Sequence, residues 1–99
     1  MKKITIFLIA LFFTTLSEAS TPVGEISRIY PNDGRIYFKL KNDSCNPNGY
    51  YYFSMSSENG ETWYSLILAA ANTSKKIAVR VANCPVSGNA QIVYVYQDF

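Results

Sequence analysis

The chain has 99 residues, a net charge of +2 and no histidine. A charge this close to zero gives no electrostatic case for binding nucleic acid. The lack of histidine removes the commonest general base, together with the serine–histidine and cysteine–histidine nucleophile pairs. The sequence also shows no glycine-rich phosphate loop and no cluster of metal ligands. We therefore expect a protein that is not an enzyme, has no catalytic residue and needs neither a cofactor nor a metal.

Residues 1–19 have the pattern of a signal peptide: a basic start, an apolar run over 4–16 and small residues before the cleavage site. The apolar run is shorter than the roughly 20 residues that a membrane-spanning helix needs, and an uncleaved anchor is the alternative. We expect cleavage after Ala19, with cleavage after Ser20 as the second choice. Residues 20–99 then form one small domain that is periplasmic or secreted and has no stable insertion in a membrane.

A domain this small is only marginally stable if it relies on its core alone, and a bond between its two cysteines would stabilise it further. In an exported chain, Cys45 and Cys84 are expected to form a disulfide. The bond would close a loop of roughly 40 residues and add about 2–4 kcal/mol to the free energy of unfolding. Two cysteines without any histidine are too few ligands for a zinc site.

The first half of the domain predicts three strands. Residues 23–30 form a strand that ends at the Pro-Asn-Asp-Gly turn over 31–34, which is strong turn chemistry. Residues 35–41 alternate apolar and polar side chains and complete a β-hairpin. After a polar loop that contains Cys45, the aromatic run over 50–55 predicts a third strand.

A helix is expected over residues 61–73, with Ser57 or Asn59 as its N-cap. Its apolar side chains cover two stripes, so the helix is apolar nearly all round and should be buried nearly all round. A small domain does not easily cover both stripes, so we expect one to pack on the sheet and the other to meet another subunit. The first stripe is Trp63, Leu66, Ile67 and Ala70, and the second, the expected oligomer interface, is Tyr64, Leu68 and Ala71.

Two more strands are expected after the helix, over residues 76–82 and 91–96. The order is therefore strand, strand, strand, helix, strand, strand. Five strands of this length with one helix predict a mostly β fold, the five-stranded OB-fold barrel. That fold commonly binds oligonucleotides or oligosaccharides.

Aromatic side chains are abundant in the expected domain. Packing and subunit contacts account for most of them, since tyrosine suits half-buried strands and interfaces. We also expect one or two exposed rings to stack on a ligand, and the low charge favours a sugar over a nucleotide base. The residues concerned are Tyr30, Tyr37, Tyr50, Tyr51, Tyr52, Trp63, Tyr64, Tyr94 and Tyr96.

The domain contains, in order, the segments VGEISRIY, PND, RIYFKLK, WYSLILAAA and ANC. This series resembles the receptor-binding B subunits of bacterial toxins that combine one enzymatic A chain with five B chains. The closest likeness is to the Shiga toxin B subunit, whose helix has SLLLSA where this chain has Ser65 to Ala70. The next cysteine of that family has the same spacing as Cys84. The B subunits of subtilase cytotoxin and cholera toxin are similar more distantly.

The resemblance implies an OB-fold, a ring of five subunits with glycan sites on one face, and an enzymatic A subunit as a possible partner. It also implies glycan-binding roles for residues that match the family's sites. Asp33 matches an acidic turn, Trp63 lies slightly later than the helix-start tryptophan, and the sugar-contacting loop corresponds to Asn83, Ser87 and Gly88. In the Shiga family the second cysteine pairs with one near the N-terminus, whereas the available partner here is Cys45.

The first functional hypothesis is a secreted glycan-binding protein, similar to a toxin B subunit, that forms a homopentamer and binds cell-surface carbohydrate. The alternative is a small periplasmic interaction or inhibitor protein that uses the same barrel and has no glycan activity. An oligonucleotide-binding module is a third hypothesis, weakened by the charge near zero. The size of the particle in solution separates the first two, because a monomer would refute the ring.

Overall fold

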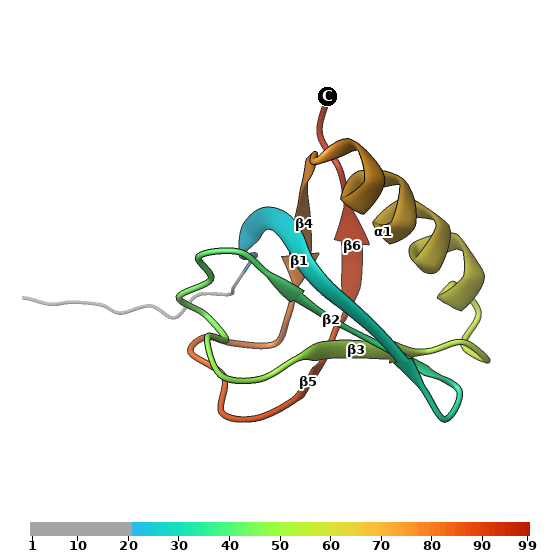
Figure 1. Ribbon diagram of the computed structural model, residues 1–99. Coiled ribbons are helices and arrows are strands. Elements are labelled where there is room, and N and C mark those ends of the chain that lie inside the picture. Colours follow the sequence, from blue (N-terminus) through green and yellow to red (C-terminus); the bar gives the residue numbers. More distant parts are fainter. Residues whose placement is uncertain (1–20) are drawn as a thin grey trace, which may run out of the picture.

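The computed structural model describes residues 21–99 (Figure 1). The expected signal peptide and both cleavage positions lie outside these residues. The described part is mostly β with one helix, and three strands precede the helix as the sequence predicts. The elements are β1 (Val23–Asn32), β2 (Arg35–Leu40), β3 (Tyr51–Ser54), α1 (Gly60–Thr73), β4 (Lys76–Arg80), β5 (Ala90–Gln91) and β6 (Tyr94–Tyr96).

β1 and β2 form the expected hairpin, but its turn is tighter than the predicted turn over 31–34. β1 continues to Asn32, which pairs with Arg35. The chain therefore reverses in two residues, Asp33 and Gly34, at φ angles of 53° and 76°. Aspartate followed by glycine is a preferred pair for such a turn, because both positions require a positive φ.

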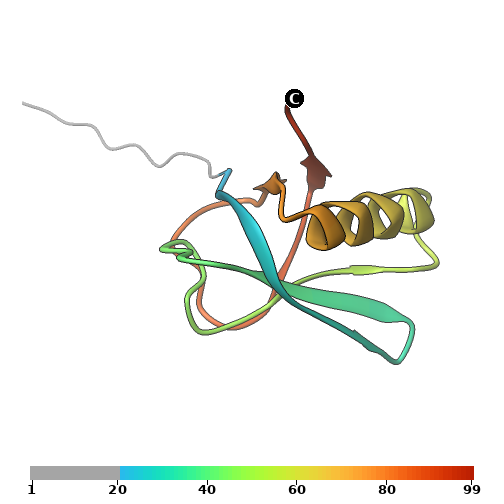
Figure 2. The same cartoon turned by 45° about the horizontal axis from the view of Figure 1, so that its top comes forward.

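Six strands of the described chain form one mixed sheet, curled into a half-barrel, in the order β5-β3-β2-β1-β4-β6 (Figures 1 and 2). The expected count of five strands, with 91–96 as one strand, is therefore wrong. The segment over 91–96 forms two strands because its backbone hydrogen bonds switch from one neighbouring strand to another. The N–H of Ile92 donates to the Tyr52 carbonyl at 3.1 Å, next to β5. The N–H of Val93 donates instead to the Arg80 carbonyl at 2.8 Å, on β4.

The division of the last segment also connects the two edges of the sheet. β5 pairs parallel with β3 at one edge, and β6 pairs antiparallel with β4 at the other. β5 and β6 are consecutive in the chain, so the residues between them carry the backbone from one edge of the sheet to the other.

A single apolar core lies between the sheet and α1, within the described residues. Alternate side chains of β2 and β3 point into this core, together with residues of α1, β4 and the last segment. The helix lies beside β1, β4 and β6 (Figures 1 and 2). The largest fully buried side chains are Tyr51, Phe38, Phe53, Ile67, Ile77, Val79 and Val81.

The start of α1 depends on close backbone packing. The helix begins at Gly60, one residue before the predicted start, and a Cβ there would lie 2.5 Å from the Ser54 carbonyl oxygen. Asn59 occupies the N-cap position, but its side chain makes no capping hydrogen bond to the described chain. Its carbonyl instead accepts from the Trp63 N–H at 2.9 Å. The other predicted cap, Ser57, donates its hydroxyl to the Ser54 carbonyl.

Cys45 and Cys84 form the predicted disulfide. The bond joins the loop after β2 to the loop after β4, at the end of the half-barrel opposite the β1–β2 turn (Figures 1 and 2). The Val86 N–H also donates to the Cys45 carbonyl at 2.7 Å, and a Cβ on Gly49 would collide with the Gly88 carbonyl. Disulfides persist in oxidising compartments, so the bond indicates an extracytoplasmic location. No helix of residues 21–99 is long and apolar enough to cross a membrane.

Candidate functional site

β2 divides its side chains between the core and the outer face of the sheet, because successive residues of a strand point to opposite faces. Its apolar residues are buried, and the outer face carries Arg35, Tyr37 and Lys39. Tyr37 is central, since the strand register places it opposite Tyr30 of β1 and Tyr52 of β3. Three neighbouring strands therefore place three tyrosines side by side.

Tyr50, directly before β3, adds a fourth ring to this group. The centroid of the Tyr37 ring lies 5.7 Å from that of Tyr30 and 5.6 Å from that of Tyr52. Tyr50 lies 5.9 Å from Tyr30 and 6.0 Å from Tyr37. These are contact distances for aromatic pairs. Tyr30 is 46% exposed and the other three are half-buried; we call these four residues the tyrosine surface.

Basic side chains accompany the tyrosine surface. Arg28 Nη1 donates to the Tyr50 hydroxyl at 3.0 Å, and Lys39 Nζ lies 5.0 Å from the centroid of the same ring. Arg35 Cζ lies 5.1 Å from the centroid of the Tyr52 ring. Both ring distances are within the range of cation–π attraction. Arg28 and Lys39 therefore contact Tyr50, and Arg35 contacts Tyr52.

The two arginines of this region are firmly positive. A hydrogen bond to a tyrosine hydroxyl is the main cause that raises the pKa of Arg28, and also that of Arg35. Among residues 21–99 the one ion pair joins Lys41 Nζ to Glu25 Oε1 at 3.3 Å, and it involves neither arginine. The outer face of β1, β2 and β3 is therefore both aromatic and positively charged.

A surface of this kind suits a ligand with a flat apolar face and a polar edge. Aromatic rings remove the C–H face of a sugar ring from water. Tyrosine hydroxyls and arginine N–H groups then hydrogen-bond to the sugar hydroxyls. Within the described chain, His, Cys, Asp and Glu side chains do not gather in any group of three or more that could hold a metal ion.

Two of the sequence-predicted glycan residues lie at one end of the half-barrel. Asp33 is at the tip of the β1–β2 turn, and the Met55 N–H donates to the Gly34 carbonyl at 2.9 Å, beside the segment that leads to α1. Trp63 lies in the first turn of α1. Its ring is half-buried and meets the Phe53 ring edge-on at 5.5 Å, so much of it packs against the core.

The other three predicted glycan residues, Asn83, Ser87 and Gly88, are exposed in the loop between β4 and β5. The disulfide places this loop at the opposite end of the half-barrel from Asp33 (Figure 1). The structure therefore separates the five residues into two groups, and none belongs to the tyrosine surface. The sequence did contain a signal for this surface. A hairpin turn made of Asp33 and Gly34 alone sets a register in which Tyr30 lies opposite Tyr37.

The expected interface residues share one side of α1. Leu68 is 38% exposed, whereas Tyr64 and Ala71 are half-buried. Ile67 and Ala70 of the same helix are fully buried in the core, and Tyr64 also packs against this core. Leu68 is therefore the most accessible of the three expected contacts.

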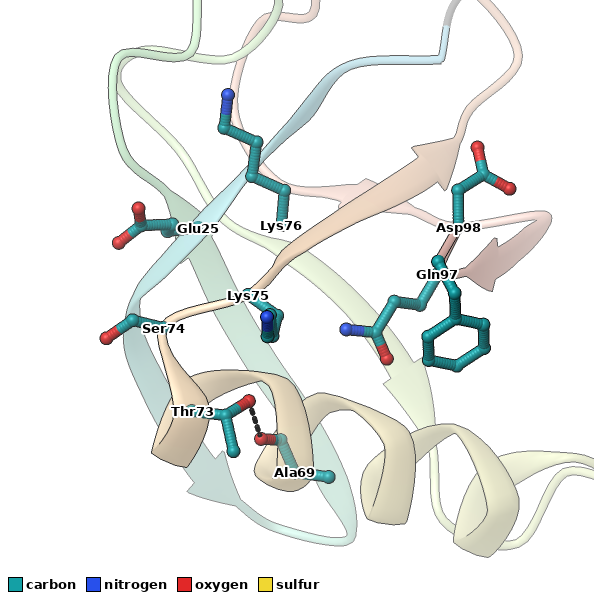
Figure 3. A pocket seen from close by; sticks show the side chains of 9 residues that line it. Glu25, Ala69, Thr73, Ser74, Lys75, Lys76, Gln97 and Asp98 are labelled. Carbon is teal, nitrogen blue, oxygen red and sulfur yellow. Dashed lines mark hydrogen bonds between the residues drawn. The ribbon is translucent and has the colours of Figure 1, made fainter.

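A second feature is a surface hollow of about 740 Å³ between the end of α1, the start of β4 and the C-terminal tail (Figure 3). Its charged side chains have both signs, and those of Lys76 and Asp98 point away from the helix in Figure 3. They therefore do not converge on a ligand. The lining residues are Glu25, Ala69, Thr73, Ser74, Lys75, Lys76, Gln97, Asp98 and Phe99.

Comparison of the chain with protein-family models, curated proteins and solved structures gives no match. The tyrosine surface is thus the feature from which a function is inferred.

Proposed function

We propose that this chain is a secreted or periplasmic glycan-binding protein, similar in role to a toxin B subunit, that binds cell-surface carbohydrate. The observation that carries the proposal is the tyrosine surface on the outer face of the sheet, in which Tyr37 contacts the other three rings and Tyr30 also contacts Tyr50. Three basic side chains lie beside these rings. Exposed aromatic patches of this kind mark interaction sites. An enzymatic A subunit as a partner belongs to the same proposal.

The sheet topology supports an OB-fold for this role. β1, β2 and β3 form an antiparallel meander, and β1 pairs with β4. Counting β5 and β6 as one interrupted strand gives five strands, in which the last strand pairs with both β3 and β4. This arrangement fits the five-stranded, partly open barrel that binds oligosaccharides in other proteins.

A glycan array probed with the purified exported chain tests the proposal, and we expect binding to at least one cell-surface carbohydrate. Tyr30→Ala should weaken that binding about tenfold, because it removes an exposed stacking ring. Tyr94→Ala is the matched control, since Tyr94 is exposed to a similar extent, 43% against 46%, but belongs to β6. An equal loss of glycan affinity in the two variants, or no binding of the wild type to any glycan, would contradict the proposal.

The proposal includes a homopentameric ring in which α1 contributes Tyr64, Leu68 and Ala71 to the subunit contact. Leu68→Asp is expected to dissociate the ring into single chains, because it places an unpaired charge in a desolvated interface. Light scattering coupled to gel filtration measures the change, as a mass of five chains falling to the mass of one.

Thr62→Asp is the control for the ring, because Thr62 is exposed on α1 outside the expected contact. This variant should remain pentameric. A Leu68→Asp protein that stays oligomeric would remove these three residues from the interface. A wild-type protein that is monomeric would refute the ring itself.

A protein partner is the second candidate ligand for the same surface. Tyrosine and arginine are enriched among the residues that dominate protein–protein binding energies, and both types occur here. A monomeric wild-type protein without glycan binding would therefore favour the small periplasmic interaction or inhibitor protein.

A further inference from the structure

Two of the three cations beside the tyrosine surface lie at one place. Arg28 of β1 and Lys39 of β2 are partners in the strand register, so they lie side by side on neighbouring strands. Both approach Tyr50: Arg28 donates to its hydroxyl at 3.0 Å, and the Lys39 ammonium lies 5.0 Å from its ring centroid. Two positive charges therefore converge on one tyrosine at the edge of the aromatic group.

These two cations keep unused hydrogen-bond donors. A guanidinium has five N–H donors and an ammonium has three. Arg28 donates once within the described chain, to Tyr50, and the one ion pair of residues 21–99 involves neither Arg28 nor Lys39. A carboxylate or sulfate is the group that such a pair of donors binds best, because hydrogen bonds between ionised partners are the strongest available.

The third cation, Arg35, stands apart from this pair. It lies four residues from Lys39 on β2, which corresponds to roughly 13 Å along a strand. The rings of Tyr37 and Tyr52 occupy the interval between them. An anion at the Arg28–Lys39 end would thus leave the central rings free to stack on uncharged sugar units of the same ligand.

We propose that the glycan is acidic and that its carboxylate or sulfate binds between Arg28 and Lys39, next to the Tyr50 hydroxyl. This inference rests on the glycan-binding function proposed above. A single-stranded nucleic acid would also use aromatic rings and cations. The glycan is favoured because the disulfide places the chain in an oxidising compartment and the net charge of the whole chain is only +2.

The test is an array that carries each oligosaccharide in a neutral, a sulfated and a sialylated form, with a single-stranded oligothymidylate as a further probe. We expect at least tenfold stronger binding of an acidic form than of its neutral parent, since hydrogen bonds to charged groups are worth more than that factor. The preference should weaken as the salt concentration rises, because the contact is solvent-exposed. Binding of one acidic form alone supports the inference and identifies the anion.

The double variant Arg28→Gln/Lys39→Gln should lose the preference for the acidic form. Lys75→Gln/Lys76→Gln, which removes the same charge beside the hollow at the end of α1, should keep it. Circular dichroism and thermal unfolding check that both variants are folded. Equal binding of neutral and acidic forms, or an unchanged preference in the first variant, overturns the inference but not the glycan function. Binding to no glycan, or to the oligonucleotide in preference, overturns both.

Discussion

The double substitution Cys45→Ala/Cys84→Ala is expected to lower the free energy of unfolding by about 2–5 kcal/mol. The disulfide spans a sequence separation of 39 residues, so its loss releases a long loop in the unfolded chain. In the folded protein the bond joins two loops that otherwise meet through few backbone hydrogen bonds. Small domains have only about 5–15 kcal/mol in total, so this is a large fraction. Denaturant unfolding at neutral pH measures the change.

Two controls separate the cross-link from the side chains that form it. Wild-type protein in a reducing agent should lose about as much stability as the double variant, since both lack the covalent bond. Asn48→Ala changes an exposed side chain of the same loop and should alter the free energy of unfolding by no more than about 0.5 kcal/mol. Equal stability of the wild type and the double variant would contradict the prediction.

Tyr51→Phe is expected to lower the free energy of unfolding by about 1.5–3 kcal/mol at neutral pH, the range for a hydrogen bond to a charged group. The Tyr51 ring is fully buried, and its hydroxyl donates to Asp43 Oδ2. The other carboxylate oxygen accepts from the Cys45 N–H at 2.9 Å, so Asp43 connects the disulfide loop to the core. Phenylalanine keeps the ring and its packing but removes the donor. Denaturant unfolding of the two proteins measures the difference.

The same tyrosine makes stability depend on pH in the alkaline range. Burial in the first place, and then the hydrogen bond to Asp43, raise the pKa of Tyr51 above its ordinary value of about 10. The folded state therefore favours the neutral phenol. The stability that results from this preference is fully present below the pKa of Tyr51 in the unfolded chain. It is lost as the pH rises from there toward the higher pKa of Tyr51 in the folded protein.

Other tyrosines titrate in the same range, so the readout is the difference in unfolding free energy between wild type and Tyr51→Phe. We expect this difference to shrink as the pH rises above about 10, because only the wild type carries the Tyr51 proton. A difference that stays constant through the alkaline range would show that Tyr51 does not favour its neutral form on folding.

The part of the candidate site that could be predicted is the direction of the β2 side chains. Alternation over 35–41 places Tyr37 and Lys39 on the face opposite the core. Two neighbours of Tyr37 could not be predicted with the same ease, because Tyr52 of β3 and Tyr50, directly before β3, follow a long loop. The family resemblance pointed instead to the hairpin turn, the start of the helix and the loop after β4, and the structure places those residues at two separate ends of the half-barrel.

Several elements of this protein follow from the sequence by itself, because their causes are local or chemical. Alternating side chains produce β2, and the Asp33–Gly34 pair produces the hairpin turn. The mostly apolar run over 63–71, which contains no glycine or proline, produces most of the helix. The two cysteines of an expected exported chain predict the disulfide. Each of these depends on a few neighbouring residues, or on the compartment in which the chain folds.

The tertiary structure alone decided which edges of the sheet meet and which side chains share a surface. Ile92 and Val93 bond to β3 and β4, which lie next to opposite edges of the sheet. This choice depends on how the whole sheet curls around Phe38, Tyr51 and Phe53. Strand register also brings Arg28 beside Lys39, so that both cations reach Tyr50. Register and curvature are set by packing over the entire core, and no window of consecutive residues contains that information.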